Sequence, residues 1–390
     1  MSKNEQDIMI PQNILNRKVK FIFTLCGIWP GISCVLFYRM FWIITMTIAI
    51  SYLLSYLLAH LYTAELMDLI DCLCLMLAHI KVISKCFIFW LNQKSLIEIL
   101  TLMAEDWDDC TDNDISMRET SKKAKLSDRL VNAIFILHTT TVSAYCIGLF
   151  LSDMDITDQM IELPFIGKLK VPFHINTQRV YKLTIVAQSL HMILCGWVAG
   201  ITNVLLLTLT LHTASQIDIL RYWITQLTSC ESKLIVITIK KIIQKHQKIV
   251  TFSENIECLY TYIALVQFVS NTVMICSLGF LIVTAIGNPN AMEQIMKSLL
   301  FYTITNLEAF IFCFAGEYMS NKSKEIGVAA YNSTWYDLKS KDSRVLLFVM
   351  LRSQKQLTLT AGKMMDLSLE SFKNIMSASG SYLSMLLAMQ

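Results

Sequence analysis

The chain has 390 residues, of which 54% are hydrophobic and 16% are charged, and its formal net charge is +3. Together with a mean hydropathy of +0.51, this balance excludes an ordinary soluble domain and indicates an integral membrane protein. So small a net charge gives no reason to expect nucleic acid as a partner.

Seven stretches are long and apolar enough to be membrane spans, since about 20 residues are needed for a helix to cross a bilayer. In chain order they are 38–59, 69–91, 130–151, 183–212, 256–286, 298–320 and 366–389. The second is the least apolar, because Asp71, His79, Lys81 and Lys85 interrupt it. These four fall near one side of the helix, which predicts that they face the interior of a bundle. The expected fold is an all-α integral membrane protein with seven transmembrane helices.

The distribution of lysine and arginine predicts the orientation. The N-terminal segment and the loops after spans two, four and six together hold 24 of these residues, whereas the loops on the opposite side hold only a few. Loops rich in lysine and arginine stay on the cytoplasmic side. We therefore expect a cytoplasmic N-terminus at 1–37, six transmembrane helices within 38–320, a cytoplasmic segment at 321–365 and an outward-running last helix at 366–390.

This orientation and the cysteines argue against a G-protein-coupled receptor, the first alternative for a seven-helix protein. Such receptors place the N-terminus outside and have an extracellular disulfide, yet none of the 12 cysteines falls in a predicted extracellular loop. A transporter is disfavoured because all five prolines lie outside the spans and no internal repeat is found. Motifs of hydrolytic or metal-dependent enzymes are not found either, so we expect no enzyme.

Three histidines raise the question of a metal site. His79, His138 and His191 fall on different predicted spans and show no ligand spacing. Interior histidines with local hydrogen bonds are the better interpretation, so the sequence assigns neither a metal nor a cofactor.

The last span carries a polar face. Glu370, Asn374, Ser377, Ser381 and Ser384 recur at alternating steps of four and three, which places them on one side of a helix. A helix in lipid keeps such a face where it meets water or another polar surface. The alternative is hydrogen bonding of serines to a neighbouring helix, a contact that contributes only about 1 kcal/mol.

The segments 220–258 and 335–352 mix aliphatic and polar residues at helical spacing. This pattern predicts that helices continue beyond the membrane. The alternative, a solvated basic loop beside anionic lipid, would leave many apolar side chains exposed.

The C-terminal sixty residues and a short motif before the first span carry a family resemblance. The sequences are GIWP at 27–30, WYDL at 335–338, RVLLFVM at 344–350, RSQK at 352–355, LTLTAGK at 357–363, LSLESF at 367–372 and SYL at 381–383. They resemble the insect odorant receptor family. Gln356 stands where that family usually has proline, which affects only the local turn.

The resemblance implies a subunit of a heterotetrameric, odorant-gated, non-selective cation channel, formed with a shared co-receptor in the plasma membrane of an olfactory neuron dendrite. It implies an anchor domain built from 213–255 and 321–363, and a pore lined by the last helix. Because the co-receptor has a longer second cytoplasmic loop, this chain resembles a ligand-tuning subunit. A metabotropic chemoreceptor and a gustatory-type receptor channel remain the alternatives. The resemblance assigns pore and gate roles to Asn374, Ser377, Ser381, Met385 and Met389.

The family places its pocket in the outer half of the membrane, between spans two, three, four and six. A small, volatile and mostly apolar ligand needs aromatic and aliphatic walls with few polar groups. The residues that these spans would contribute are Leu75, His79, Thr141, Tyr145, Gly148, Gln188, His191, Met192, Phe301, Tyr302 and Thr305. Ordinary packing is the alternative role for each of them.

Overall fold

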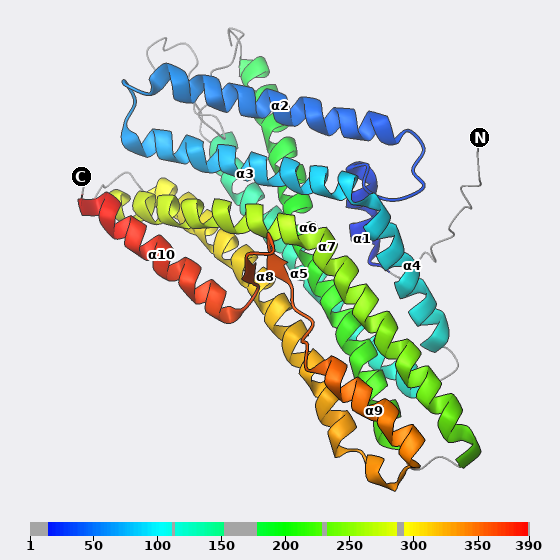
Figure 1. The fold of residues 1–390 in the computed structure, drawn as a ribbon. Coiled ribbons are helices and arrows are strands. Elements are labelled where there is room, and N and C mark those ends of the chain that lie inside the picture. Colours follow the sequence, from blue (N-terminus) through cyan, green and yellow to red (C-terminus); the bar gives the residue numbers. More distant parts are fainter. Residues whose placement is uncertain (1–14, 111–113, 152–177, 228–231, 287–291, 389–390) are drawn as a thin grey trace.

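The computed structural model describes residues 15–110, 114–151, 178–227, 232–286 and 292–388, and this part is almost entirely helical (Figure 1). In order, the helices are α1 (Arg17–Leu25), α2 (Val35–His60), α3 (Leu66–Leu91), α4 (Gln93–Cys110), α5 (Asp114–Leu151), α6 (Gln178–Gln226), α7 (Ser232–Ala285), α8 (Met292–Asn332), the 3-10 helix η2 (Trp335–Asp337), α9 (Ser340–Ser353) and α10 (Leu369–Ala388). Between α9 and α10, the strands β1 (Thr360–Ala361) and β2 (Met365–Asp366) pair antiparallel.

Five helices of the described part, α2, α3, α6, α7 and α8, are long and apolar enough to cross a membrane. Each corresponds to one predicted span, and only the fifth span, 256–286, extends one residue beyond its helix. The predicted third span lies in the C-terminal part of α5, and the seventh corresponds to α10. The prediction of an all-helical membrane protein is thus confirmed, while the number of seven spans and the orientation stay predictions. The last helix begins at Leu369 and not at 366, because Asp366 belongs to β2.

Three helices are far longer than a bilayer is thick. α6, α7 and α8 contain 49, 54 and 41 residues, so at about 1.5 Å per residue they extend roughly 60 to 80 Å. The hydrocarbon core of a bilayer is about 30 Å thick. Together with α9 these helices form a bundle that extends away from α2 and α3 (Figure 1). Much of the segments 220–258 and 335–352 is helical, as their spacing predicts.

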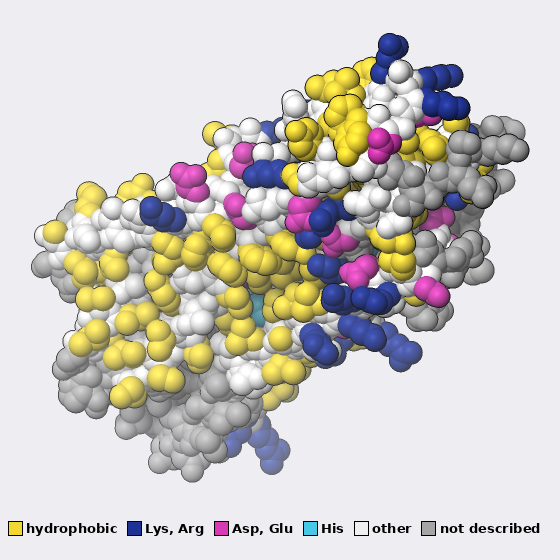
Figure 2. Space-filling view, turned by 90° about the horizontal axis from the view of Figure 1, so that it is seen from below, with side chains coloured by type: hydrophobic (Ala, Val, Ile, Leu, Met, Phe, Trp, Pro, Cys, Tyr) yellow, Lys and Arg dark blue, Asp and Glu magenta, His cyan; other side chains and the backbone are white. Residues whose placement is uncertain are grey.

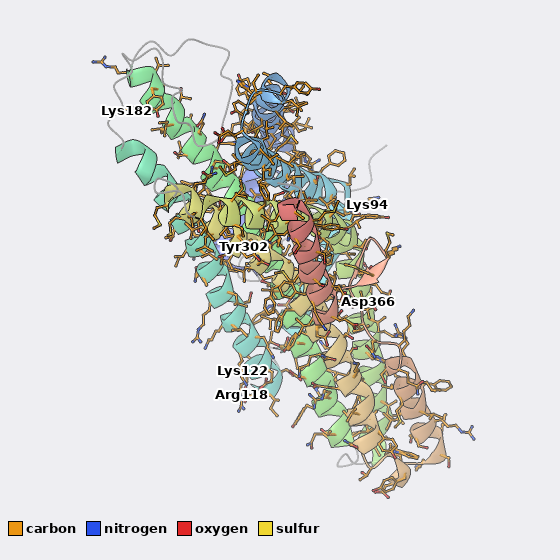
Figure 3. The ribbon with its side chains drawn as sticks, turned by 90° about the vertical axis from the view of Figure 1, so that its left-hand side faces the viewer. Lys94, Arg118, Lys122, Lys182, Tyr302 and Asp366 are labelled. Carbon is orange, nitrogen blue, oxygen red and sulfur yellow. The ribbon has the colours of Figure 1, made fainter. Side chains whose placement is uncertain are left out.

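Hydrophobic and charged side chains are concentrated on different halves of the molecule. Figure 2 shows hydrophobic side chains over one half of the face in view, and most of the charged ones gathered over the other half. In Figure 3, Lys182 lies at one end of α6, whereas Arg118 and Lys122 lie near the opposite end of the bundle, on α5. An apolar half beside a charged half is the pattern expected of helices that leave the membrane on one side.

The first helix is fixed to the bundle by two indole groups. Trp42 Nε1 donates to the Leu25 carbonyl at 3.0 Å, and Trp90 Nε1 donates to the Cys26 carbonyl at 3.0 Å. The chain then turns at Gly27, whose φ of 64° suits a residue without a Cβ. The GIWP motif at 27–30 therefore forms the turn that leads from α1 to α2.

A buried carboxylate connects α4 to the long helices. Asp106 is 3% exposed, and its oxygens lie 3.0 Å from His212 Nε2, 2.8 Å from Lys245 Nζ and 3.0 Å from Lys248 Nζ. Burial by itself raises the pKa of this carboxyl. The hydrogen bond from His212 and the charges of the two lysines outweigh burial and hold the pKa well below its usual range.

The hairpin before α10 is held against α7. The Glu257 carboxylate accepts hydrogen bonds from the backbone N–H of Thr360, at 2.8 Å, and from its hydroxyl. The Gly362 N–H donates to the Thr261 carbonyl at 2.9 Å. On the α8 side, a Cβ at Gly316 would lie 2.2 Å from the carbonyl oxygen of Leu367, so only glycine allows this approach. The start of α10 is thus fixed to both α7 and α8.

Candidate ligand cavity and polar face of the last helix

A cavity of about 150 Å³ lies between α3, α5, α6 and α8. Its walls are mainly apolar, with a few polar groups from three of the four helices. The lining residues are Leu75, Ala78, His79, Lys81, Val82, His138, Thr141, Val142, Met192, Cys195, Gly196, Ala199, Lys297, Leu300, Phe301, Ile304, Thr305 and Glu308. A cavity of this size accommodates a molecule about as large as benzene. We call it the inner cavity.

A network of buried charges and amides borders the inner cavity. Lys81 Nζ lies 2.7 Å from Glu308 Oε2 and donates to Asn271 Oδ1 at 3.0 Å. Gln267 Nε2 donates to the same Glu308 oxygen at 2.6 Å, and Asn203 Nδ2 donates to the other at 3.2 Å. Lys81 and Glu308 are each about 5% exposed. Such charges are tolerated in a membrane only when they are paired, as they are in this network.

The network contains one more positive charge than negative. Lys85, only 2% exposed, donates to Asn203 Oδ1 at 2.8 Å. The ammonium groups of Lys81 and Lys85 therefore have one carboxylate, that of Glu308, as their common counter-charge in this network. The excess favours a ligand that can accept a hydrogen bond or carry partial negative charge at the polar end of the cavity.

The predicted interior face of the second span is confirmed, but its partner was missed. His79, Lys81 and Lys85 are buried, and Asp71 pairs with Lys297 at 2.5 Å. Glu308 was not singled out, although it is an acidic residue in the middle of a predicted span. An isolated charge at that depth is a recognised indicator of function. Because buried charges are usually paired, a lysine on the interior face of one span predicts an acidic partner on another. Glu308 is such a residue for Lys81.

The predicted pocket residues fall into four groups. Leu75, His79, Thr141, Met192, Phe301 and Thr305 line the inner cavity. Tyr302 packs against the buried residues of α3 and α7 instead. Tyr145 and Gly148 lie on α5, at positions where the structure describes the backbone alone. Gln188 and His191, with Leu75, His79 and Met192, line a neighbouring cavity of about 260 Å³ between α2, α3 and α6. We call this second space the outer cavity.

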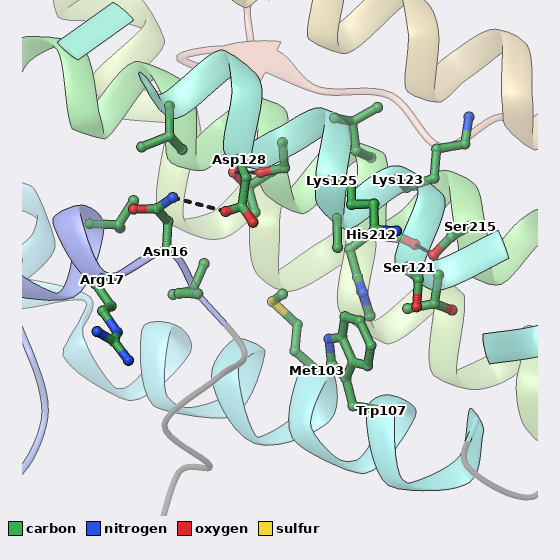
Figure 4. Close-up of a pocket in the computed structure, with 18 of the residues that line it drawn as sticks. Asn16, Arg17, Met103, Trp107, Ser121, Lys123, Lys125, Asp128, His212 and Ser215 are labelled. Atoms are coloured by element: carbon green, nitrogen blue, oxygen red, sulfur yellow. Dashed lines mark hydrogen bonds between the residues drawn. The ribbon is translucent and has the colours of Figure 1, made fainter. Parts of the chain in front are cut away.

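A larger cavity of about 570 Å³ has a different character. It lies between α1, α4, α5 and α6, and its lining includes Arg17, Lys123 and Lys125 (Figure 4). Asn16 crosses it to donate to Asp128 at 2.9 Å. Four cationic side chains and a carboxylate among its walls make it unsuitable for an apolar ligand.

The polar face of α10 points away from the rest of the chain. The five residues of the predicted polar face are all exposed, whereas Ile375 and Ser379 on the opposite side are buried. Ser381 donates to the Ser377 carbonyl at 3.0 Å and Ser384 to that of Gly380 at 2.9 Å, both on the same helix. These serines therefore do not serve packing within the described chain.

The apolar end of this face carries the predicted gate. Met385 is 61% exposed and continues the exposed side one turn beyond Ser381. Met389, the other predicted gate residue, lies outside the described residues. Most of the Met385 side chain is thus not packed against the described chain.

Comparison with known proteins assigns the family. Residues 65–380, most of the chain, match the family model described as 7tm Odorant receptor. The chain belongs to the insect odorant receptor family. This is a family of receptors, not of enzymes, and the resemblance seen in the C-terminal sixty residues is thereby confirmed.

Named relatives and solved structures agree with this assignment. The chain is 34% identical to Odorant receptor 10 of Aedes albopictus over 158 residues, and 28% identical to Odorant receptor Or2 of Anopheles gambiae over 148 residues. These stretches cover 40% and 38% of this chain, and 41% and 38% of those receptors. The fold is similar to that of the insect olfactory receptor OR5 from Machilis hrabei in complex with eugenol, with a TM-score of 0.74, 13% identity and coverage of 96% of this chain and 97% of that one.

Proposed function

We propose that this odorant receptor is the ligand-tuning subunit of an odorant-gated, non-selective cation channel, assembled as a heterotetramer with a co-receptor. The observation that carries the proposal is the exposed polar face of α10, which is presented by a membrane-length helix and is not used within the described chain. Such a face is favourable where it borders water, as in a pore through which cations pass.

The inner cavity is the proposed odorant site. Its volume of about 150 Å³ and its largely apolar walls suit a small volatile molecule. The excess positive charge of the Lys81, Lys85 and Glu308 network favours a ligand with an oxygen acceptor. Eugenol, which the Machilis hrabei receptor holds in its structure, belongs to this class: it is aromatic and has oxygen acceptors.

The proposed orientation places the N-terminus and the far ends of α6 to α9 in the cytoplasm. The long extensions of α6, α7 and α8 and the packing of α9 against α8 support an anchor domain at 213–255 and 321–363. In an assembly, this domain would hold subunits together while α10 lines the pore.

Current recordings with matched cavity variants test both the channel and the pocket. Cells expressing this chain with the co-receptor should give a cation current within milliseconds of odorant application, and blocking G-protein cycling should leave that current unchanged. Ala199 lines the inner cavity and Ala187 the outer one, on the same helix. Ala199→Leu adds three carbons to the wall of the inner cavity and should weaken the response to the best odorant by about tenfold or more, since even one extra methylene in a filled pocket costs about 1–3 kcal/mol.

Ala187→Leu is the control, because it makes the same change outside the inner cavity. An equal loss with both variants would contradict the assignment of the inner cavity. A response that disappears when G proteins are blocked would contradict the channel and favour the metabotropic alternative.

A further inference from the structure

Two histidines and a cysteine meet at the wall between the inner and outer cavities. His79 on α3 lines both spaces, Cys195 lines the inner one and His191 the outer one. One ligand atom from each of the three lies within 4.8 Å of the other two. The imidazole rings of His79 and His191 are stacked with centroids 5.4 Å apart. We propose that these three side chains form a binding site for a soft, thiolate-preferring metal ion.

A hydrogen bond within α3 orients His79 for metal binding. His79 Nδ1 donates to the Leu75 carbonyl at 2.7 Å, so its other ring nitrogen, Nε2, has a free lone pair. Metal-binding histidines commonly donate their second ring nitrogen to a backbone carbonyl in this way, which fixes both tautomer and ring orientation. On α6, His191 and Cys195 are four residues apart and so share one helix face. His191 Nε2 lies 3.5 Å from Cys195 Sγ.

The three ligand atoms need to move only a short distance toward one another to bind one metal ion. Ligands of a tetrahedral zinc ion with bonds of about 2.0–2.3 Å lie roughly 3.3–3.8 Å apart. The His191 to Cys195 pair is already at this separation, and rotamer adjustments of His79 can bring in the third ligand. The ion would connect α3 to α6 beside the proposed odorant site.

Charge favours monovalent copper over zinc. Binding removes the proton of the Cys195 thiol and releases it to solvent, so the ligand set carries one negative charge. Cu⁺ then gives a neutral site, whereas Zn²⁺ leaves a charge of +1. The network of Lys81, Lys85 and Glu308 bordering the same cavity already has an excess positive charge, and a further one in low dielectric is unfavourable. Thiolate and imidazole ligands both suit Cu⁺.

Metal titration of the purified, odorant-free receptor tests the proposal without depending on channel activity. The metal-stripped full chain is titrated with Cu⁺ under reducing conditions against a chromophoric chelator, and separately with Zn²⁺. We expect one tight equivalent of Cu⁺ per chain. His79→Gln, His191→Gln and Cys195→Ser should each lower its affinity at least about tenfold. His246→Gln and Cys313→Ser alter a histidine on α7 and a cysteine on α8, both outside the cluster, and should leave the affinity unchanged.

X-ray absorption at the metal edge of the unmutated receptor supplies a measurement that needs no variant. It should show nitrogen and sulfur neighbours in a ratio of two to one. Tight binding of Zn²⁺ that depends on the same three residues would support the site and identify zinc as its ion. Absence of a tight equivalent of either ion, or binding that the three cluster variants leave intact, would overturn the proposal.

Discussion

Lys81 on α3 and Glu308 on α8 are separated by 227 residues in sequence, yet the ammonium nitrogen and a carboxylate oxygen lie 2.7 Å apart inside the bundle. The pair connects the second predicted span to the sixth at the border of the inner cavity. Because both side chains are buried, neither charge can be compensated by water if the other is removed. Their relationship therefore links the stability of the fold to the polar end of the proposed pocket.

Removing the carboxylate should be strongly destabilising. Glu308→Gln keeps the shape of the side chain but leaves Lys81 and Lys85 buried without a counter-charge, which costs about 3–5 kcal/mol. Thermal unfolding of the detergent-purified receptor, together with the yield of monodisperse protein, measures the loss. The additional change Lys81→Met should restore part of the stability. Glu254→Gln, at an exposed position on α7, is the matched control and should have little effect. Equal unfolding temperatures for Glu308→Gln and the parent receptor would show that the network does not stabilise the fold.

The gate prediction uses the exposed apolar end of α10. If Met385 converges with its equivalents across a pore, its apolar side chain excludes water in the closed state, and a serine removes that barrier. Met385→Ser should therefore raise the current recorded without odorant in cells that also express the co-receptor. Met389→Ser is predicted to act in the same way, and Ser384→Ala should change little. Apolar gate residues on partner subunits would reduce the effect. If both methionine variants show unaltered gating and ion selectivity, the assignment of the pore to this face of α10 is wrong.

Orientation can be tested at two exposed tyrosines. Tyr62 follows α2 and is 95% exposed, and Tyr331 lies near the end of α8 and is 70% exposed. The charge distribution predicts that Tyr62→Cys reacts with a membrane-impermeant maleimide on intact cells. Tyr331→Cys should react only after permeabilisation, and the parent receptor gives the background from native cysteines. The reverse pattern of labelling would invert the proposed topology.

The Asp106 cluster predicts a definite pH dependence. Because the folded-state pKa of Asp106 is depressed, its contribution to stability is fully present above its unfolded pKa of about 3.9 and is lost as the pH falls toward the lower folded value. Asp106→Asn should therefore lower the unfolding temperature by a nearly constant amount from pH 5 to 8. Below about pH 4 the difference from the parent should narrow. Unfolding curves recorded across this range measure both. A difference that grows on acidification would mean that another group is responsible.

Local periodicity made some features of the site predictable from the sequence. The polar face of α10 stands out because its polar residues recur with the helical period among leucine, isoleucine and methionine. The interior face of α3 was predictable for the same reason, since Lys81 and Lys85 lie one turn apart in an apolar helix. In both cases the contrast between polar and apolar residues distinguishes one face of the helix, which is buried in α3 and exposed in α10.

Other features depend on contacts between distant segments, which local patterns do not reveal. The pairing of Lys81 with Glu308 and the meeting of His79 with Cys195 arise only when α3 packs against α8 and α6. Neighbouring helix positions point about 100° apart, so Phe301 lines the inner cavity while Tyr302, the next residue, does not. The hairpin of β1 and β2 was also not predicted, because two-residue strands have no periodicity to detect.

The polar face of α10 also has a consequence for the assembly of the subunit and its export to the cell surface. An unpartnered copy inserted in lipid would hold Asn374 and a row of serine hydroxyls against hydrocarbon, an arrangement that costs free energy until partners enclose the face. An unassembled subunit of this kind would be recognised and retained by the quality control of membrane proteins. Delivery to the cell surface would then require completed assembly, and the residues proposed to line the pore would also control export.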